Sequence, residues 1–134
     1  MSTEYYIQGY TDEQPDGTAV ADVLAAFGKR EGDHDNGFYR LRYDENAHCD
    51  ASLTVRDGLV TAICVHRPCH HQDLYRAIFE VLSKGPYVLF MPGGKAPLVA
   101  RAEVAAHLPD DMVDALGAPV CVTDADRIPA ELIG

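Results

Sequence analysis

Hydrophobic and polar positions alternate in three segments of the chain, and this period of two predicts half-buried strands. The segments are residues 5–10, 38–43 and 51–56. Asp57-Gly58 follows the third segment and favours a type I′ hairpin turn, because both central positions of that turn need positive φ. The return strand, 59–66, is apolar on both faces over most of its length. We therefore expect it to be central in the sheet.

Apolar positions spaced three and four residues apart predict two amphipathic helices. The first covers residues 20–27, with Thr18 as the expected N-cap and an end near Gly28. The second covers residues 74–82 and is ended by Gly85-Pro86.

The remaining segments complete a single globular domain over residues 1–134. We expect an exposed loop at 29–37, a buried strand at 87–91, a Gly-Pro loop at 92–97, short helical segments at 101–108 and 110–116, a short strand at 119–123 and a peripheral C-terminal tail at 124–134. The sum predicts an α+β domain with a mainly antiparallel sheet and helices packed on one face. The other face is then partly open or covered by a partner. The pattern does not predict the strand order.

Composition fits a soluble globular domain. The chain has 134 residues, of which 47% are hydrophobic and 24% charged, and these shares are ordinary for such a domain. Its longest apolar runs, such as residues 87–91, are far shorter than the roughly 20 residues that a membrane span needs. The first residues carry neither the positive nor the apolar region of a secretory signal, so we expect a cytoplasmic protein.

The net charge of −10 is concentrated at the two ends of the chain. Residues 1–50 carry 11 acids and 4 bases, a net of −7; residues 51–100 carry 3 acids and 5 bases, a net of +2; residues 101–134 carry 7 acids and 2 bases, a net of −5. A negative surface attracts cationic partners and repels nucleic acids and anionic lipids. We therefore expect a cationic protein as partner, with no nucleic acid and no membrane.

Acidic clusters on three consecutive loops are the candidate partner-binding residues. They are Asp12, Glu13 and Asp16; Glu31, Asp33 and Asp35; and Asp44 and Glu45. If these loops converge on one edge of the domain, they steer a basic partner and raise its association rate. The alternative is a solvated acidic surface that keeps the protein in solution.

Cysteine and histidine residues are dense in segment 64–71, where the predicted central strand meets the second helix. The candidate metal ligands there are His66, Cys69, His70 and His71, because zinc prefers thiolate and imidazole ligands. No second ligand pair at matching spacing accompanies them. The alternative interpretation is exposed histidines beside a thiol that packs in the core.

All four cysteines are expected to be reduced and mostly buried, since no secretory signal is visible. They are Cys49, Cys64, Cys69 and Cys121. Cys69 lies close to the start of the second helix, a position that would lower a thiol pKa for nucleophilic catalysis. Spacing alone identifies neither a histidine within reach of this thiol nor an orienting group.

Two other motifs have plainer interpretations. Gly93-Gly94-Lys95 lacks the spacing of a phosphate-binding loop and is followed by Ala96 rather than Ser or Thr, so we expect a turn. Asp110 and Asp111 follow Pro109 and precede an apolar run, which suits a helix N-cap and first-turn acids. Signatures of nucleotide-binding, lipase and metalloprotease sites are absent from the sequence, and no cofactor is expected.

Residues 67–117 carry a set of short motifs. They are Arg67-Pro68-Cys69, Leu74 to Phe79, Val88 to Gly94, Pro97-Leu98-Val99 and His107 to Val113. With these motifs, its small size and its acidity, the chain resembles immunity proteins that neutralise polymorphic toxins of bacterial type VI or contact-dependent systems. The resemblance implies a toxin partner with a basic cleft. It implies no residue roles, since immunity families share a job rather than a site.

Three hypotheses therefore remain. In the first, the chain is a binding module, an immunity protein that occludes the basic active site of a cognate toxin with its acidic loops. In the second, it is a small metal- or thiol-dependent enzyme centred on residues 66–71. In the third, it is a structural or oligomer-forming domain. The sequence predicts neither the oligomeric state nor the identity of the partner.

Overall fold

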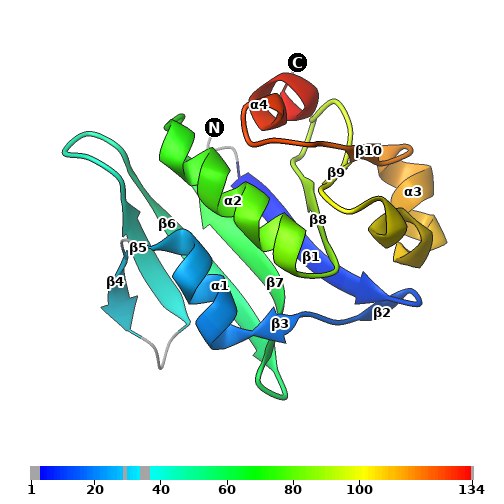
Figure 1. Ribbon diagram of the computed structural model, residues 1–134, viewed down its shortest axis with the longest axis horizontal. Helices are drawn as coiled ribbons and strands as arrows, with labels where there is room; N and C mark the ends of the chain where they lie inside the picture. The colour runs from blue at the N-terminus through cyan, green and yellow to red at the C-terminus, as the bar shows by residue number, and fades with distance from the viewer. Residues whose placement is uncertain (1–3, 29, 34–36, 134) are drawn as a thin grey trace.

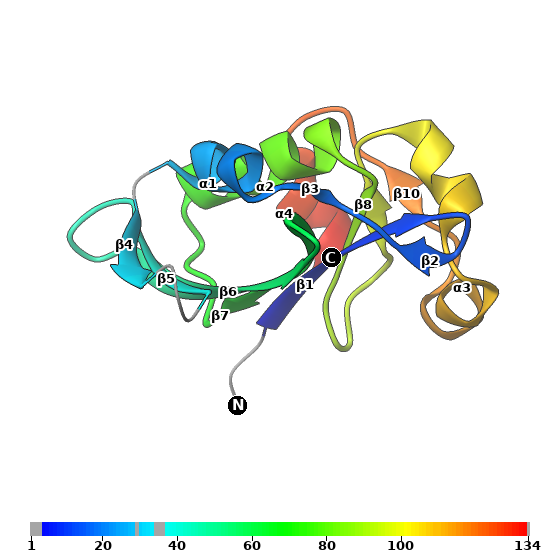
Figure 2. The ribbon, with the colours of Figure 1, turned by 90° about the horizontal axis from the view of Figure 1, so that it is seen from below.

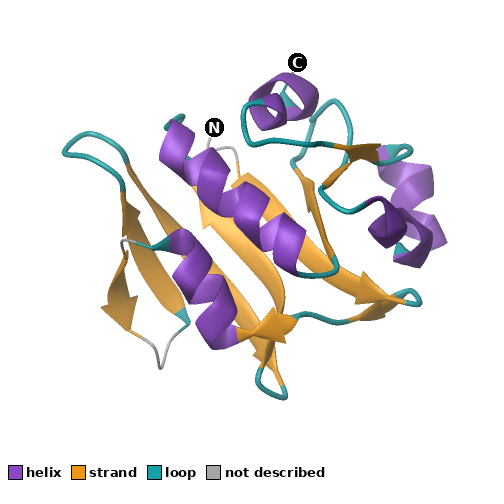
Figure 3. Cartoon of the chain, viewed as in Figure 1, coloured by secondary structure: helices purple, strands orange, loops and turns teal. Residues whose placement is uncertain are grey.

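The computed structural model describes residues 4–28, 30–33 and 37–133, which form an α+β fold around one mainly antiparallel sheet (Figure 1; Figure 3). The strands are β1 (Glu4–Thr11), β2 (Gln14–Pro15), β3 (Thr18–Ala19), β4 (Arg30–Asp33), β5 (Phe38–Arg42), β6 (His48–Arg56), β7 (Leu59–His66), β8 (Tyr87–Phe90), β9 (Leu98–Val99) and β10 (Val120–Cys121). The helices are α1 (Val20–Phe27), α2 (Gln72–Lys84), the 3₁₀ helix η2 (Ala102–His107), α3 (Asp110–Leu116) and α4 (Arg127–Leu132). The expected fold class is confirmed.

The strand order is β10-β9-β8-β1-β7-β6-β5-β4, with β2 added to β1 and β3 added to β7. β9 and β10 pair in parallel, whereas β1, β7, β6 and β5 pair with their neighbours in antiparallel register. β7 lies between β1 and β6, so the expectation that the return strand is central is confirmed. This order brings the first described residue, Glu4, opposite His66 at the end of β7.

One face of the sheet is covered by α1 and α2, and we call it the helix-covered face (Figure 2). Alternate residues of β1 and β7 point to this face, including Tyr5, Ile7, Ile63 and Val65, and none of them exposes more than 1% of its surface. The helix α2 packs on them through its apolar residues, Leu74, Tyr75, Ala77, Ile78, Val81 and Leu82. This is the core that the helical spacing of the sequence predicts.

The opposite face of β5, β6, β7 and β1 is not covered by the described helices, and we call it the open face (Figure 2). Its residues alternate with the buried ones and are Phe38, Arg40, Asp50, Ser52, Cys64, His66, Glu4 and Tyr6. Beyond β1, the same face is closed over β8 by η2 and α3. There Val88, Val99, Val104 and Leu108 form a second, smaller core.

The hairpin turn at Asp57-Gly58 is confirmed, because both residues have positive φ, 54° and 80°. The expected exposed loop at 29–37 is wrong in part, since residues 30–33 form β4 and pair with β5. Residues 29 and 34–36 lie outside the described residues. The polar composition of β4 suits an edge strand, which explains why no apolar alternation reveals it.

Thr18 is not the N-cap of α1. Its backbone pairs with Val60 as part of β3, and the N-cap is Ala19, which makes no side-chain capping bond. The Thr18 amide instead donates to the Tyr87 hydroxyl at 2.9 Å, and that hydroxyl donates to the Val60 carbonyl at 2.6 Å. A long-range contact therefore replaces the local cap that the sequence suggests.

The C-terminal tail is not peripheral. Its helix α4 buries Ile128 and Leu132 completely in the main core, and the amide of Lys95 donates to the Leu132 carbonyl at 2.8 Å. Within the described residues, none of the helices is long and apolar enough to cross a membrane.

Candidate functional site

Aromatic side chains stand out on the open face. Phe38 exposes 46% of its surface and stacks on the imidazole of His66, with ring centroids 5.6 Å apart. Tyr6 and Phe90 stack in the same way on the neighbouring strands, with centroids also 5.6 Å apart. A sheet face that meets only water normally carries polar side chains. Among these rings Phe38 is exposed, whereas Tyr6 and Phe90 are half-buried. An exposed aromatic ring at such a place is typical of a surface that binds something.

The open face also gathers three potential metal ligands from β1 and β7. Strand register places Glu4 opposite His66 and Tyr6 opposite Cys64, so that Glu4, Cys64 and His66 share the face. The Cys64 Sγ lies 3.6 Å from Glu4 Oε2 and 3.7 Å from His66 Nδ1, and His66 Nδ1 lies 3.5 Å from Glu4 Oε1. Among the described residues, these three form the group of ligand atoms compact enough to hold a metal ion.

Neighbouring side chains fix the orientation of two of these ligands. The Tyr6 hydroxyl donates to Glu4 Oε2 at 2.8 Å, and this hydrogen bond lowers the pKa of the Glu4 carboxyl. On the other side, Ser52 Oγ lies 3.1 Å from His66 Nε2. When Nε2 carries the ring proton and donates it to Ser52, Nδ1 presents its lone pair to Cys64 and Glu4.

The same three residues are poorly suited to cysteine nucleophilic catalysis. Burial, and then the negative charge of Glu4, raise the pKa of Cys64 to about 11. A catalytic cysteine needs the opposite environment, in which a cationic neighbour stabilises the thiolate. Here the carboxylate accepts a hydrogen bond from the thiol itself. The geometry therefore disfavours the thiol-enzyme hypothesis at Cys64.

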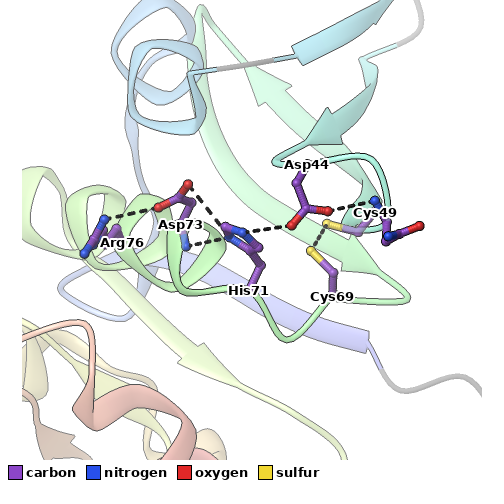
Figure 4. A network of polar contacts seen from close by, with 7 residues as sticks. Asp44, Cys49, Cys69, His71, Asp73 and Arg76 are labelled. Carbon is purple, nitrogen blue, oxygen red and sulfur yellow. Dashed lines mark hydrogen bonds and ion pairs between the residues drawn. The ribbon is translucent and has the colours of Figure 1, made fainter.

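A second cluster lies on the helix-covered side, where the β5–β6 turn meets the start of α2 (Figure 4). His71 is the N-cap of α2, because its Nδ1 accepts from the Asp73 amide at 3.1 Å, and its Nε2 lies 3.2 Å from Asp44 Oδ2. Beside it, the Cys49 and Cys69 sulfurs are 4.0 Å apart and both thiols are free. Burial raises the pKa of both thiols. This network explains how the start of α2 is held in place.

Of the cysteines, Cys49 alone is fully buried; Cys64 and Cys69 are half-buried and Cys121 is exposed. The expectation of buried thiols is therefore wrong for Cys121.

The stability of the fold is expected to fall as the pH rises above about 9. Burial raises the pKa of Cys49 to about 12, whereas a cysteine in an unfolded chain titrates near about 8.5. The folded state then keeps a proton that the unfolded state loses, so this stabilisation is complete below about pH 8.5 and is lost as the pH rises toward 12.

Urea unfolding midpoints between about pH 7 and pH 10 measure this decline. The variant Cys49→Ala is expected to be less stable at neutral pH but to show a shallower loss on raising the pH. The same steepness in Cys49→Ala as in the wild type would contradict the prediction.

The metal ligands expected from sequence are not brought together. His66 points to the open face, whereas Cys69 and His71 belong to the cluster at the start of α2 on the other side of the sheet. His70 is exposed, and its Nδ1 lies 3.0 Å from the Tyr75 hydroxyl. The chain bends sharply after β7, where Arg67 has a φ of 50°. Neighbours in sequence therefore end on opposite faces of the sheet.

The acidic loops do not converge on one edge. The Asp12-Glu13 turn follows β1 at one end of the strands, where Asp12 lies 3.3 Å from His107 Nδ1. The turn that carries Asp44 and Glu45 joins β5 to β6 at the opposite end, beside His71. Negative charge is thus divided between two opposite ends of the sheet.

The remaining acidic candidates are more scattered. Asp16 accepts a hydrogen bond from Thr11 Oγ1 at 2.7 Å within the β1–β2 hairpin. Glu31 and Asp33 belong to the edge strand β4, and Asp35 lies outside the described residues.

Asp110 and Asp111 lie in the first turn of α3 as expected, but the N-cap is Pro109 and makes no side-chain bond. A residue from far along the chain satisfies one of the free amides, since the Asp110 amide donates to Glu13 Oε1 at 3.1 Å. Glu13 therefore has a structural role at α3 in addition to its exposed charge.

Sequence reasoning did not include Glu4 or Cys64 among the candidate metal ligands. The spacing of Cys64 and His66 in a predicted strand already indicates that both point to one face. The position of Glu4, 60 residues earlier, depends on the pairing of β1 with β7. Comparisons with protein-family models, with curated proteins and with solved structures find no match for the chain.

Proposed function

We propose that the protein is a binding module that neutralises a cognate bacterial toxin, acting as an immunity protein, and that the open face is its binding surface. The observation that carries this proposal is the group of aromatic side chains on a sheet face that the described helices leave uncovered. Phe38, which is exposed, and Tyr6, which is half-buried, supply it, whereas Phe90 stacks on Tyr6 but packs against the second core. Interface centres are enriched in aromatic and arginine side chains, and Arg40 lies beside Phe38 on the same strand.

A protein partner fits this surface better than a nucleic acid. Aromatic residues on a sheet face can stack on unpaired bases, but nucleic-acid affinity comes mainly from neutralised phosphates. A chain with a net charge of −10 repels them. Two stacked aromatic pairs together with an ion pair, Arg40–Asp50 at 3.4 Å, give the mixture of apolar and polar contacts that protein interfaces use.

The acidic turns support a cationic partner through their positions at the two opposite ends of the sheet, although Asp44 itself contacts His71 toward the helix-covered side. The Asp12-Glu13 turn and the Asp44-Glu45 turn are exposed, and both can attract a basic surface that is laid across the strands. Such charges outside the centre of an interface act mainly on the association rate and on its salt dependence. The aromatic side chains would then determine how slowly the complex dissociates.

The first test is binding of the toxin candidate encoded by the neighbouring reading frame. We expect a stable complex that abolishes the toxin's activity, and Phe38→Ala is expected to raise the dissociation rate about 30-fold, as for a hot-spot residue worth about 2 kcal/mol. Ile133→Ala is the matched control, since Ile133 exposes 45% of its surface and is the C-cap residue of α4, a helix that packs against α2. Absence of any complex would rule out the immunity proposal.

Charge neutralisation tests the acidic turns separately. Asp12→Asn/Glu13→Gln and Asp44→Asn/Glu45→Gln are each expected to slow association several-fold at low salt, with little difference from wild type at high salt. Asp22→Asn/Glu80→Gln removes the same charge from exposed positions on α1 and α2 and is expected to have a smaller effect. Equal rates for all three double variants would show that the turns act only through the net charge.

A further inference from the structure

Glu4, Cys64 and His66 each offer one ligand atom on the open face, and these atoms all lie within 4.8 Å of one another, close enough to hold one metal ion. Zinc holds sulfur at about 2.3 Å and nitrogen or oxygen at about 2.0–2.2 Å, so its tetrahedral ligands are about 3.3–3.7 Å from one another. Cys64 Sγ lies 3.7 Å from His66 Nδ1 and 3.6 Å from Glu4 Oε2, and His66 Nδ1 lies 3.5 Å from the other carboxylate oxygen, Glu4 Oε1. The two contacts of the thiol are hydrogen bonds of ordinary length for sulfur, and each of the three distances also lies in the range of the tetrahedron edges.

The surroundings of the group are those of a metal site. In a zinc-bound histidine, the N–H of the second ring nitrogen commonly donates a hydrogen bond to an oxygen, and zinc-bound carboxylates usually accept hydrogen bonds of their own. Here Ser52 Oγ is the oxygen beside His66 Nε2, and the Tyr6 hydroxyl donates the hydrogen bond that the Glu4 carboxylate accepts. Phe38 stacks on the His66 ring and limits its rotation. Ligand set, spacing and supporting hydrogen bonds thus agree.

We propose that Glu4, Cys64 and His66 bind a zinc ion on the open face, with Ser52 and Tyr6 as supporting residues. The Cys64 thiol loses its proton on binding, since zinc is ligated by the thiolate. Three protein ligands leave the fourth position open, as in zinc sites that bind water or an external donor. This inference does not depend on the toxin partner, because it concerns only residues of this chain.

The ion would also connect the start of β1 to the end of β7. Glu4 is the first residue of β1, and Cys64 and His66 are near the last of β7. A ligand that binds only the folded state stabilises it by mass action. Added zinc is therefore expected to raise the melting temperature of the wild-type protein, and a chelator is expected to reverse the increase.

The experiment uses the full chain without a histidine tag. After incubation with excess zinc and dialysis, we expect about one zinc ion per chain, and cobalt substitution is expected to give a thiolate-to-metal charge-transfer band and the intense visible bands of tetrahedral cobalt. Less than about a tenth of an equivalent of zinc, with no thiolate band from cobalt, would overturn the proposal.

Variants assign the site to its residues. Cys64→Ser, His66→Gln and Glu4→Gln are each expected to weaken zinc binding about 100-fold or more, and Ser52→Ala about 10-fold, as for a supporting residue. Cys69→Ser and His70→Gln are the matched controls and are expected to retain wild-type affinity. Since Cys64 and His66 lie on the open face, circular dichroism is expected to show an unchanged fold. Loss of binding in Cys69→Ser but not in Cys64→Ser would overturn the assignment.

Discussion

Gly17→Ala is expected to destabilise the protein by about 3 kcal/mol, near the upper end of what overpacking usually costs. A Cβ at this position would lie 1.8 Å from the Val60 carbonyl oxygen and 3.0 Å from the Tyr87 hydroxyl. Val60 O is a backbone atom of the central strand β7, so it cannot move without disturbing the sheet. The added methyl group would separate β3 from β7 and break the hydrogen bonds that the Tyr87 hydroxyl makes to Thr18 and Val60.

Urea unfolding of the full chain measures this loss. Gly93→Ala is the matched control, because Gly93 has a φ of 72° but nothing lies within 4 Å of its added Cβ. Its expected cost is only the strain of a left-handed alanine, about 1 kcal/mol. If both variants lost the same stability, the close approach of Gly17 to β7 would not be a constraint on the fold.

Elements with strong local signals could be predicted from the sequence. The helix α2 has apolar residues at steps of three and four, the spacing of one helix face, and ends at Gly85-Pro86, and the β6–β7 hairpin has the Asp57-Gly58 pair at its turn. In both cases the preferred backbone conformation of a few adjacent residues agrees with the tertiary structure. The α+β class follows from these elements, because an alternating strand and an amphipathic helix must bury their apolar sides together.

Elements that depend on distant contacts could not be predicted. The edge strand β4 is polar and exists through its pairing with β5. Thr18 looks like a helix cap, but its side-chain hydroxyl lies 3.2 Å from the Tyr87 hydroxyl, 69 residues away, and its backbone pairs with β7. The burial of residues 124–134 depends on packing against distant elements, so their sequence alone suggests a peripheral tail. Two of these positions nevertheless reach the main core.

The candidate site illustrates the same division. Cys64 and His66 could be placed on one face from strand periodicity, whereas the pattern of residues 66–71 suggested a ligand set that the bend after β7 separates. The acidic turns could be identified as exposed, but their position at opposite ends of the sheet depends on the strand order. Strand order is set by the long-range pairing of β1 with β7 and β8, which the local pattern does not encode.

Leu132→Ala is expected to destabilise the protein by about 3 kcal/mol, because removing a buried leucine side chain loses its transfer free energy and leaves a cavity. Leu132 is the last residue of α4 and is fully buried in the main core. The adjacent Ile133 exposes 45% of its surface, so Ile133→Ala is expected to change stability by less than about 0.5 kcal/mol. Urea unfolding of the two variants compares neighbouring aliphatic residues that differ in burial. Equal, small losses would mean that the tail is peripheral in solution, as its sequence suggests, whereas a large loss confined to Leu132→Ala is the result expected if α4 is part of the core.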